Sequence, residues 1–205
     1  AGRRIDDFHG QKRRLSTQEV FIHSSNIGAG LMALKLGGPR QRQYLDQFGL
    51  TGDLVMEGAG VARPLLPQRW TEIETATIAY GHGIALTPLQ FLAAAAALVN
   101  GGVRVWPSIL TSGRPQAANP VQVIKPDVSR QMRALMRLNV ADAKGTGRRA
   151  DVPGLEIGGK TGTADIARNG RYAERAVIAS FLGAFPMSNP RYVTLLLLFE
   201  PEPTM

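Results

Sequence analysis

The hydrophobic residues follow two different patterns along the chain. Up to about residue 140 they recur at helical spacing, and from about residue 156 they form short runs separated by turn residues. We therefore predict a helical region over about residues 15–140 and strands over about residues 156–200. Because the turns between the apolar runs are short, the strands should be antiparallel neighbours, which makes the fold class α+β.

Residues that favour helix starts mark three of the predicted helices. Residues 16–19 (STQE) and 71–74 (TEIE) match the capping box, in which a hydroxyl caps the first turn and a glutamate reaches back. Residues 87–90 (TPLQ) combine a capping threonine with proline at the first helical position. Residues 91–99 contain no polar side chain, which predicts a buried central helix.

The C-terminal apolar runs predict three strands joined by turns at residues 168–171 and 187–190. The strands are expected at residues 156–164, 176–185 and 192–200. Residues 51–69, by contrast, contain glycines and prolines without any period, which indicates a long surface loop. At 205 residues the whole chain, 1–205, is short enough to form one domain.

The composition limits the chemistry that this chain can perform. The sequence has no cysteine, which excludes cysteine nucleophiles, thiolate metal sites and disulfides. Its three histidines lack the spacing of metal ligands, and we expect neither a metal nor a cofactor. The longest apolar run, residues 91–99, is much shorter than the roughly 20 residues that cross a bilayer, so no transmembrane helix is expected within the sequence.

The net charge of +8 raises the question of a nucleic-acid partner. The basic residues are dispersed, however, and aromatic residues make up only 6% of the chain, too few to form a stacking platform among them. We therefore expect no nucleic acid to bind. Solvated basic faces, or attraction to an anionic membrane or wall polymer, explain the charge better.

Two glycine-rich stretches match nucleotide-binding motifs but lie in the wrong context. Residues 28–33 fit the dinucleotide pattern G-x-G-x-x-A, yet a helix rather than a buried strand is predicted before them. Small residues that allow close helix packing are the simpler interpretation. Residues 154–161 fit the P-loop pattern G-x-x-x-x-G-K-T, but no buried strand precedes them and no helix follows. A P-loop nucleotide binder is therefore only a remote alternative.

Two further motifs point to serine acyl-transfer chemistry. Lys160–Thr161–Gly162 is a K-T-G motif on a predicted strand, and Ser24–Ser25–Asn26 is an S-x-N motif at a junction between predicted helices. These are two of the three motifs of active-site serine enzymes that react with penicillins. Each also has a structural explanation, since serine and asparagine are common helix caps and a polar strand suits a sheet edge. Their occurrence together, in this order, favours the functional interpretation.

In detail the sequence resembles the transpeptidase domain of class B penicillin-binding proteins, in particular the septal type that makes division peptidoglycan. The resemblance rests on residues 21–28 (FIHSSNIG), 80–83 (YGHG), 87–90 (TPLQ), 145–147 (GTG) and 160–164 (KTGTA). It covers nearly the whole chain and implies the penicillin-binding transpeptidase and serine β-lactamase fold, an antiparallel sheet packed between helical groups. The implied activity is D,D-transpeptidation through a serine acyl-enzyme.

The resemblance also implies roles for individual residues. The Ser24 hydroxyl would relay a proton towards the leaving D-alanine amine, and the Asn26 amide would hold a peptide group of the substrate. Lys160 would supply positive potential for the terminal carboxylate of the substrate, which the Thr161 and Thr163 hydroxyls would bind. The backbone N–H of Thr163 would be one donor of the oxyanion hole.

Three glycine and tyrosine positions complete the expected substrate site. The strand that carries Gly162 would pair with the peptide by strand addition, and the missing side chain there would let the peptide approach closely. The loop at Tyr80 and Gly81 would support the site. The expected ligands are a peptidoglycan stem peptide ending in D-Ala-D-Ala and β-lactam antibiotics, and the expected protein partners are those of the divisome.

One motif of the family is missing from this sequence. The family takes its nucleophile and base from S-x-x-K, but none of the eight serines is followed by lysine three residues later. Those serines are Ser16, Ser24, Ser25, Ser108, Ser112, Ser129, Ser180 and Ser188. We therefore expect a partial transpeptidase domain, cut at both ends and inactive alone. The resemblance further implies that the complete protein is anchored in the inner membrane, with this part in the periplasm. The alternative is a non-catalytic divisome or cell-wall binding module on the same fold.

Overall fold

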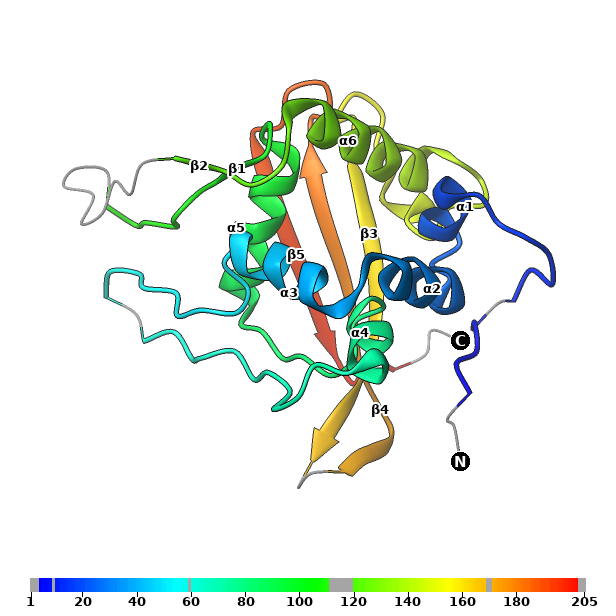
Figure 1. Cartoon of the computed structure of the whole chain (residues 1–205). Coiled ribbons are helices and arrows are strands. Elements are labelled where there is room, and N and C mark those ends of the chain that lie inside the picture. Colours follow the sequence, from blue (N-terminus) through cyan, green and yellow to red (C-terminus); the bar gives the residue numbers. More distant parts are fainter. Residues whose placement is uncertain (1–3, 9, 59, 111–119, 169–170, 203–205) are drawn as a thin grey trace. The chain divides into compact units, whose positions relative to one another are not determined.

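The computed structural model of the chain describes residues 4–8, 10–58, 60–110, 120–168 and 171–202 (Figure 1). The chain forms two compact units, Ala1–Arg133 and Ala134–Met205. The first unit is mainly helical and the second contains a three-stranded sheet. Each unit is described by itself.

The first unit is built from short helices separated by loops. Its elements are α1 (Thr17–Ile22), α2 (Asn26–Leu36), α3 (Gly38–Gln47), α4 (Glu72–Ile78), α5 (Pro88–Val99), β1 (Val103–Arg104), β2 (Val121–Gln122) and the first half of α6 (Pro126–Ala141). Helix α2 packs against α1, α3 and α4, so it joins these four helices.

The predicted capping residues begin the helices as expected. The Ser16 hydroxyl accepts a hydrogen bond from the Glu19 backbone N–H, and the Glu19 carboxylate accepts one from the Ser16 N–H. Thr71 and Glu74 form the same arrangement at α4. The Thr87 hydroxyl caps α5. These helix starts depend on local contacts alone, which is why the sequence predicts them.

Helix α5 is less buried than its composition suggests. Ala94, Ala95, Ala97 and Val99 are buried, but Phe91 is 39% exposed. The prediction of a buried helix is therefore correct for the side that carries these four residues and wrong for Phe91. The other residues of 91–99 are half-buried, so the apolar sequence does not show which side packs most tightly.

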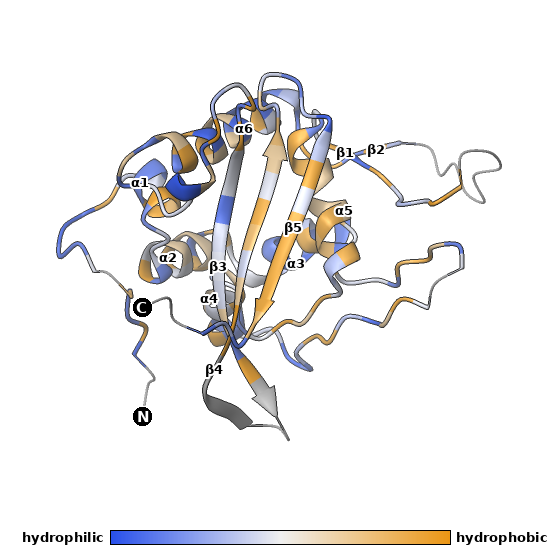
Figure 2. Cartoon of the chain, turned by 180° about the vertical axis from the view of Figure 1, so that it is seen from behind, coloured by the Kyte–Doolittle hydropathy of each residue, from blue (hydrophilic) through white to orange (hydrophobic). Residues whose placement is uncertain are grey.

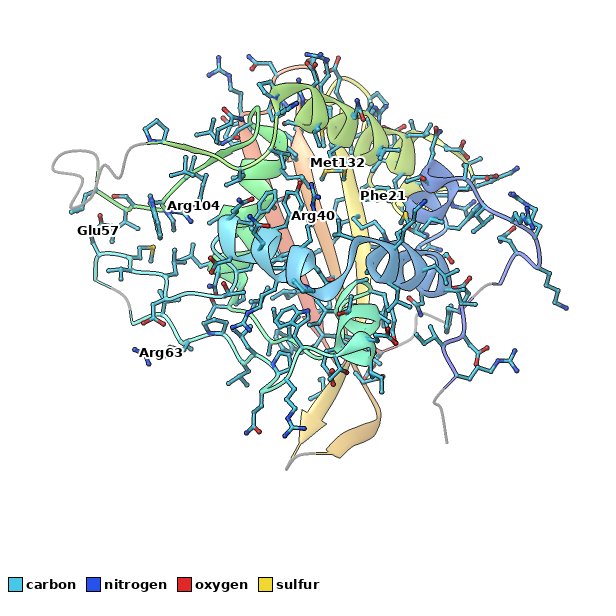
Figure 3. The ribbon with its side chains drawn as sticks, in the orientation of Figure 1. Phe21, Arg40, Glu57, Arg63, Arg104 and Met132 are labelled. Carbon is cyan, nitrogen blue, oxygen red and sulfur yellow. The ribbon has the colours of Figure 1, made fainter. Side chains whose placement is uncertain are left out.

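The predicted loop at residues 51–69 makes a tertiary contact through one acidic residue. The Glu57 carboxylate accepts hydrogen bonds from the Ser108 hydroxyl (3.0 Å) and the Ile109 N–H (3.4 Å). Figure 3 shows Glu57 and Arg63 on this long connection between α3 and α4. The connection is thus tied at Glu57 to the segment that follows β1.

The sheet of the second unit has the order β3-β4-β5, with both pairs antiparallel. Its strands are β3 (Gly158–Arg168), β4 (Arg171–Phe185) and β5 (Tyr192–Phe199). Lys160 pairs with Leu182 and Phe181 pairs with Leu196 in this register. The three predicted strands are confirmed, although β3 and β4 extend further towards their shared turn. Residues 169 and 170 of the predicted turn lie outside the described residues.

Strand β5 carries large apolar side chains on an exposed face. Tyr192 is 62% exposed, Leu196 59% and Leu198 49%. Figure 2 shows this strand as almost continuously hydrophobic. Its alternating neighbours Val193 and Leu195 are half-buried, which follows from the two-residue period of a strand.

Among the residues that the structure describes, no helix is both long and apolar enough to cross a membrane. The described residues likewise include no group of three or more histidine, aspartate or glutamate side chains placed to hold a metal ion.

Candidate active site

The S-x-N motif forms the turn between α1 and α2, in the first unit. The Ser24 N–H donates to the Phe21 carbonyl (3.2 Å) and the Ser25 N–H donates to the Val20 carbonyl (3.0 Å), which closes the end of α1. Ser24 has a φ of 53°, a left-handed conformation that non-glycine residues adopt infrequently. Its exposed side chain therefore projects from a strained turn, a feature typical of functional sites.

The middle residue of the motif holds the turn in place. Ser25 is 5% exposed, and its hydroxyl oxygen accepts from the Gly28 N–H (3.0 Å) as the cap of α2. The same hydroxyl donates to the Asp7 carboxylate (2.8 Å), whose other oxygen accepts from the Ile27 N–H (3.0 Å). Ser25 is thus a structural residue, and the helix-cap explanation of the motif is correct for this serine.

The segment before α1 also contacts Asn26. The side-chain amide of Asn26 donates to the Asp6 backbone carbonyl at 3.1 Å. Together with the Asp7 carboxylate, this contact ties both ends of the turn to residues that lie about 20 positions earlier. Sequence reasoning missed Asp7, because an acidic residue in a loop gives no sign of which distant helix end it will meet.

The small residues after the turn serve helix packing. A Cβ atom on Gly28 would lie 2.4 Å from a methyl group of Val20 on α1, and one on Gly30 would lie 3.6 Å from the Ala76 carbonyl on α4. Because helix α1 precedes this stretch, the G-x-G-x-x-A match does not belong to a dinucleotide site. The packing interpretation is confirmed.

The predicted residues Tyr80 and Gly81 lie just beyond the end of α4. The Tyr80 and His82 rings are tilted against each other with centroids 5.4 Å apart. Gly81 has a φ of 97°, which only glycine adopts readily, and its N–H donates to the Ile78 carbonyl. Since α4 packs against α2, the structure brings together the two helices that carry this loop and the S-x-N turn.

The K-T-G motif lies in the second unit, on β3. Lys160, Gly162 and Thr163 pair with residues of β4 in an unbroken register, and β3 continues as a strand to Arg168. A P-loop requires a helix directly after its lysine and threonine. Because a strand and not a helix follows residues 160–161, the structure does not support the remote alternative of a P-loop.

The backbone of β3 alternates between the β4 side and the outer edge of the sheet. The Gly159 carbonyl accepts from the side-chain amide of Asn139 (2.9 Å), and the Thr161 carbonyl accepts from the Lys160 ammonium group (3.0 Å). Both carbonyls therefore face the outer edge. Thr163 lies two residues after Thr161 and has the same orientation, so its backbone N–H and C=O also face the outer edge. In the described sheet β3 is an edge strand, so this edge is suited to pairing with an extended peptide.

Two glycines let β3 lie close to its neighbours. A Cβ atom on Gly159 would lie 2.4 Å from the Leu182 carbonyl oxygen, and one on Gly162 would lie 2.6 Å from the Ser180 hydroxyl oxygen. Gly159 thus faces a backbone group that cannot move away, whereas a side chain at position 162 would displace only the Ser180 hydroxyl.

Burial lowers the pKa of the Lys160 ammonium group to about 8. The group is half-buried, and the charged form loses hydration there. A lysine with this pKa is still mostly protonated at neutral pH. It is therefore a suitable partner for a carboxylate, with a charge that disappears at moderately alkaline pH.

The side chain of Asn139 connects three elements of the second unit. It is fully buried in α6, where its amide nitrogen donates to the Gly159 carbonyl and its amide oxygen accepts from the Thr146 N–H and hydroxyl, each at 3.2 Å. A Cβ atom on Gly145 would lie 2.0 Å from the Asn139 carbonyl oxygen. The G-T-G motif at residues 145–147 is thus the turn that wraps around Asn139, which sequence reasoning also missed.

The basic face of α6 is not entirely solvated. Arg137 donates to the Asp151 carboxylate (2.8 Å) and to the Ile157 carbonyl (2.9 Å), directly before β3. Arg130, by contrast, pairs with Asp127 at the surface. The interpretation of the positive charge as solvated basic faces is therefore wrong for Arg137, which helps to anchor the start of the K-T-G strand.

Comparisons with known proteins agree with this arrangement. A family model described as the penicillin binding protein transpeptidase domain matches residues 2–204. The chain is 38% identical to a probable peptidoglycan D,D-transpeptidase FtsI of Caulobacter vibrioides, over 98% of this chain and 35% of the relative. It is 36% identical to stage V sporulation protein D of Bacillus subtilis, over 91% of this chain and 30% of that protein. The chain thus spans about a third of the length of the curated relatives it matches.

Solved structures show the same α+β fold. The transpeptidase domain of Burkholderia pseudomallei penicillin-binding protein 3, in its apo form, matches with a TM-score of 0.83 and 31% identity, over 91% of this chain and 57% of that one. Penicillin-binding protein 3 of Mycobacterium tuberculosis, in complex with aztreonam, matches with a TM-score of 0.83 and 29% identity, over 91% and 45%. The fold prediction is confirmed, and the chain belongs to the transpeptidase domain family of class B penicillin-binding proteins.

Proposed function

We propose that this chain is the part of a peptidoglycan D,D-transpeptidase that binds the terminal carboxylate of the stem peptide and supports proton transfer. The observation that carries the proposal is the K-T-G strand at a sheet edge, in a chain that matches the transpeptidase family over residues 2–204. The reaction is acyl transfer through a serine acyl-enzyme, with cross-linked stem peptides as products.

Lys160 and its strand neighbours form the carboxylate-binding part of the proposed site. The partly buried ammonium group of Lys160 attracts the terminal carboxylate, and the Thr161 and Thr163 hydroxyls donate to it. The backbone N–H of Thr163 is one donor of the oxyanion hole. This role is supported by the orientation of the Thr163 backbone towards the outer edge of β3. Gly162 leaves room for an extended peptide along the edge.

Ser24 and Asn26 form the part that handles the peptide and the proton. The Ser24 hydroxyl passes a proton to the leaving D-alanine amine, and the exposed position of its side chain supports this role. The Asn26 amide donates to a peptide carbonyl of the substrate. In the structure this amide donates to the backbone carbonyl of Asp6, which has the same chemistry. Tyr80 and Gly81 support the site from the end of α4.

The nucleophile and its base are absent from the sequence, because no serine is followed by lysine three residues later. We therefore propose that this chain alone does not form an acyl-enzyme with a β-lactam. The second candidate is a non-catalytic divisome or cell-wall binding module on the same fold. The observation that favours it is the missing S-x-x-K motif.

The cellular setting of the proposal follows from the relatives. The Caulobacter relative is named FtsI, a D,D-transpeptidase, and the Mycobacterium structure contains a β-lactam. We propose β-lactams as ligands, septal peptidoglycan synthesis as the process, and divisome proteins as partners. The periplasmic face of the inner membrane is the proposed location.

The test compares this chain with a chimaera in which the S-x-x-K segment of a class B relative precedes residue 1. Both proteins are incubated with a fluorescent penicillin, and intact mass spectrometry measures the covalent adduct. We expect no adduct on the 22.1 kDa chain and one adduct per molecule on the chimaera. Replacement of Lys160 by alanine in the chimaera should slow adduct formation at least tenfold, since the carboxylate loses its cationic partner.

Two results would contradict the proposal. An adduct on the 22.1 kDa chain itself would mean that one of its eight serines is a nucleophile. A chimaera that is folded by circular dichroism and takes up no penicillin would favour the non-catalytic module.

A further inference from the structure

The outer edge of β3 is closed at one end by a side chain of the same unit. The side-chain amide of Asn139 donates to the Gly159 carbonyl at 2.9 Å, one residue before Lys160. That carbonyl faces the outer edge, in phase with Thr161 and Thr163. An incoming strand therefore meets an acceptor that is already occupied.

The orientation of the Asn139 amide is fixed by its partners. The Thr146 N–H is only a donor, so the Asn139 oxygen must face it, at 3.2 Å. The Gly159 carbonyl is only an acceptor, so the amide nitrogen must face that side. The side chain is fully buried, and solvent does not compete for either bond. The closure is therefore a permanent part of the unit.

The closed end is the end at which the carboxylate of the substrate is proposed to bind. Lys160 and Thr161 would hold that carboxylate, and the acyl part of the peptide would extend along Thr163. A peptide that continued past its second D-alanine would have to pair with Gly159. The fully buried side chain of Asn139 is bonded to the Gly159 carbonyl and lies where the additional N–H would have to approach. That N–H would therefore lose its hydration without gaining a partner.

Resting on the proposed function, we infer that Asn139 is a specificity-determining residue, which selects peptides that end at the carboxylate over peptides extended by a further residue. Asn139 acts through the Gly159 carbonyl and does not touch the substrate. The Gly145–Gly147 turn keeps it in place, because Gly145 and Gly147 leave room for the Asn139 backbone and side chain.

The test uses two donor substrates with the chimaera, a diacyl-L-Lys-D-Ala-D-Ala peptide and the same peptide extended by one glycine. The measured quantity is the ratio of the two rates of acyl-enzyme formation, which does not depend on the fraction of active protein. Replacement of Asn139 by alanine frees the Gly159 carbonyl and leaves space beside it. The ratio should then shift towards the extended peptide by about threefold to tenfold, the range expected for one hydrogen bond gained.

Thr146→Val is the matched control. It removes the hydroxyl that donates to the Asn139 oxygen and leaves the bond between Asn139 and Gly159 intact. Its ratio should stay within about twofold of the unsubstituted chimaera, because the edge carbonyl remains occupied. If the alanine variant does not fold, Asn139→Leu keeps most of the side-chain volume, removes the donor, and is measured in the same way.

Equal slowing with both peptides in a folded Asn139 variant would overturn the inference and leave Asn139 a purely structural residue. The unmodified 205-residue chain offers a second check by hydrogen exchange. The Asn139 side-chain amide protons should exchange far more slowly than those of the exposed Asn189, and equal rates would also overturn it. A chimaera that reacts with neither peptide nor penicillin would instead refute the proposed function.

Discussion

The S-x-N turn and the K-T-G strand carry the two halves of the proposed chemistry but are held in different ways. The turn at residues 24–26 depends on a few polar contacts, chiefly those that join Ser25 and Ile27 to Asp7. Residues 160–163 lie within a ladder that pairs β3 with β4 from Gly158 to Asp165. The stability of the turn should therefore be most sensitive to the removal of its polar partners. The stability of the strand, which is hydrogen-bonded along its length, should be most sensitive to substitutions that crowd its backbone.

Crowding the strand should produce the largest effect. Gly159→Ala would bring a Cβ atom to 2.4 Å from the Leu182 carbonyl, a backbone group that cannot rotate away. We expect a loss of about 3 kcal/mol in the free energy of unfolding, measured with urea.

The matched substitution near the turn is Gly28→Ala. Its Cβ atom would meet the side chain of Val20 rather than backbone, and alanine favours the helix by roughly 1 kcal/mol. The net loss should therefore be about 1 kcal/mol or less. An equal cost at both glycines would contradict the distinction between backbone and side-chain crowding.

Removal of Asp7 should affect the turn most strongly among the polar substitutions. Asp7→Ala leaves the buried Ser25 hydroxyl and the Ile27 N–H without their acceptor, which costs about 1–3 kcal/mol in unfolding free energy. Penicillin labelling of the chimaera should slow as well, because Ser24 loses its fixed geometry.

The neighbouring residue Asp6 is the control for this prediction. Among the described residues its side chain pairs with Arg4 at the surface, whereas its backbone carbonyl accepts from Asn26 and remains after substitution. Asp6→Ala should change the free energy of unfolding by less than about 0.5 kcal/mol. A loss as large as that of Asp7→Ala would mean that general charge near α2, not the specific contacts, stabilises the turn.

The charge of Lys160 gives a prediction for pH. Since burial lowers its pKa to about 8, the protonated form is depleted as the pH rises through 8. The second-order rate constant for acylation of the chimaera by a carboxylate-bearing penicillin should fall above this pH, by up to about tenfold per unit. Lys160→Arg, which stays charged, should remove this fall in the rate constant. If the rate constant of the arginine variant still fell above pH 8, the fall would belong to another titrating group.

Of the paired substitutions, those of one arginine in each region should differ least in their cost to the free energy of unfolding. Arg13 pairs with Glu19 beside the turn; the Arg13 side chain is exposed and that of Glu19 half-buried, so Arg13→Ala should cost less than about 0.5 kcal/mol. Arg137 also bonds to the Ile157 carbonyl, next to the K-T-G strand, and Arg137→Ala should cost about 1–2 kcal/mol. Thermal unfolding of both variants would measure the difference.

Local signals account for most of what the sequence predicts. Ser16, Thr71 and Thr87 cap helices through contacts within three residues, and the two-residue period of 192–199 reflects one exposed and one half-buried face. The contacts of Asp7 and Asn139 connect residues about 20 positions apart. A single sequence gives no sign of such pairings, since both residue types are ordinary in loops and helices.

The S-x-N and K-T-G motifs were predicted from the sequence, but the way they are supported was not. Gly162 is expected to make room for a substrate, and in the structure its missing side chain also leaves room for the Ser180 hydroxyl. The burial of residues 91–99 was overestimated, because a run of alanines gives no periodic signal of its exposed side. The roles of the site residues and the single-domain boundaries of the chain stay predictions.

The left-handed backbone of Ser24 limits how this position can vary during drug selection. In the role proposed for Ser24, a variant has to keep a hydroxyl for proton relay and also tolerate a φ near 53°. Threonine keeps the hydroxyl but is β-branched, and a branched residue is poorly tolerated in this conformation. Asparagine and glycine tolerate the conformation but carry no hydroxyl. A substitution at this position thus has to meet two separate requirements, one of backbone geometry and one of proton chemistry. Resistance to β-lactams should therefore arise more readily through neighbouring residues than at Ser24 itself.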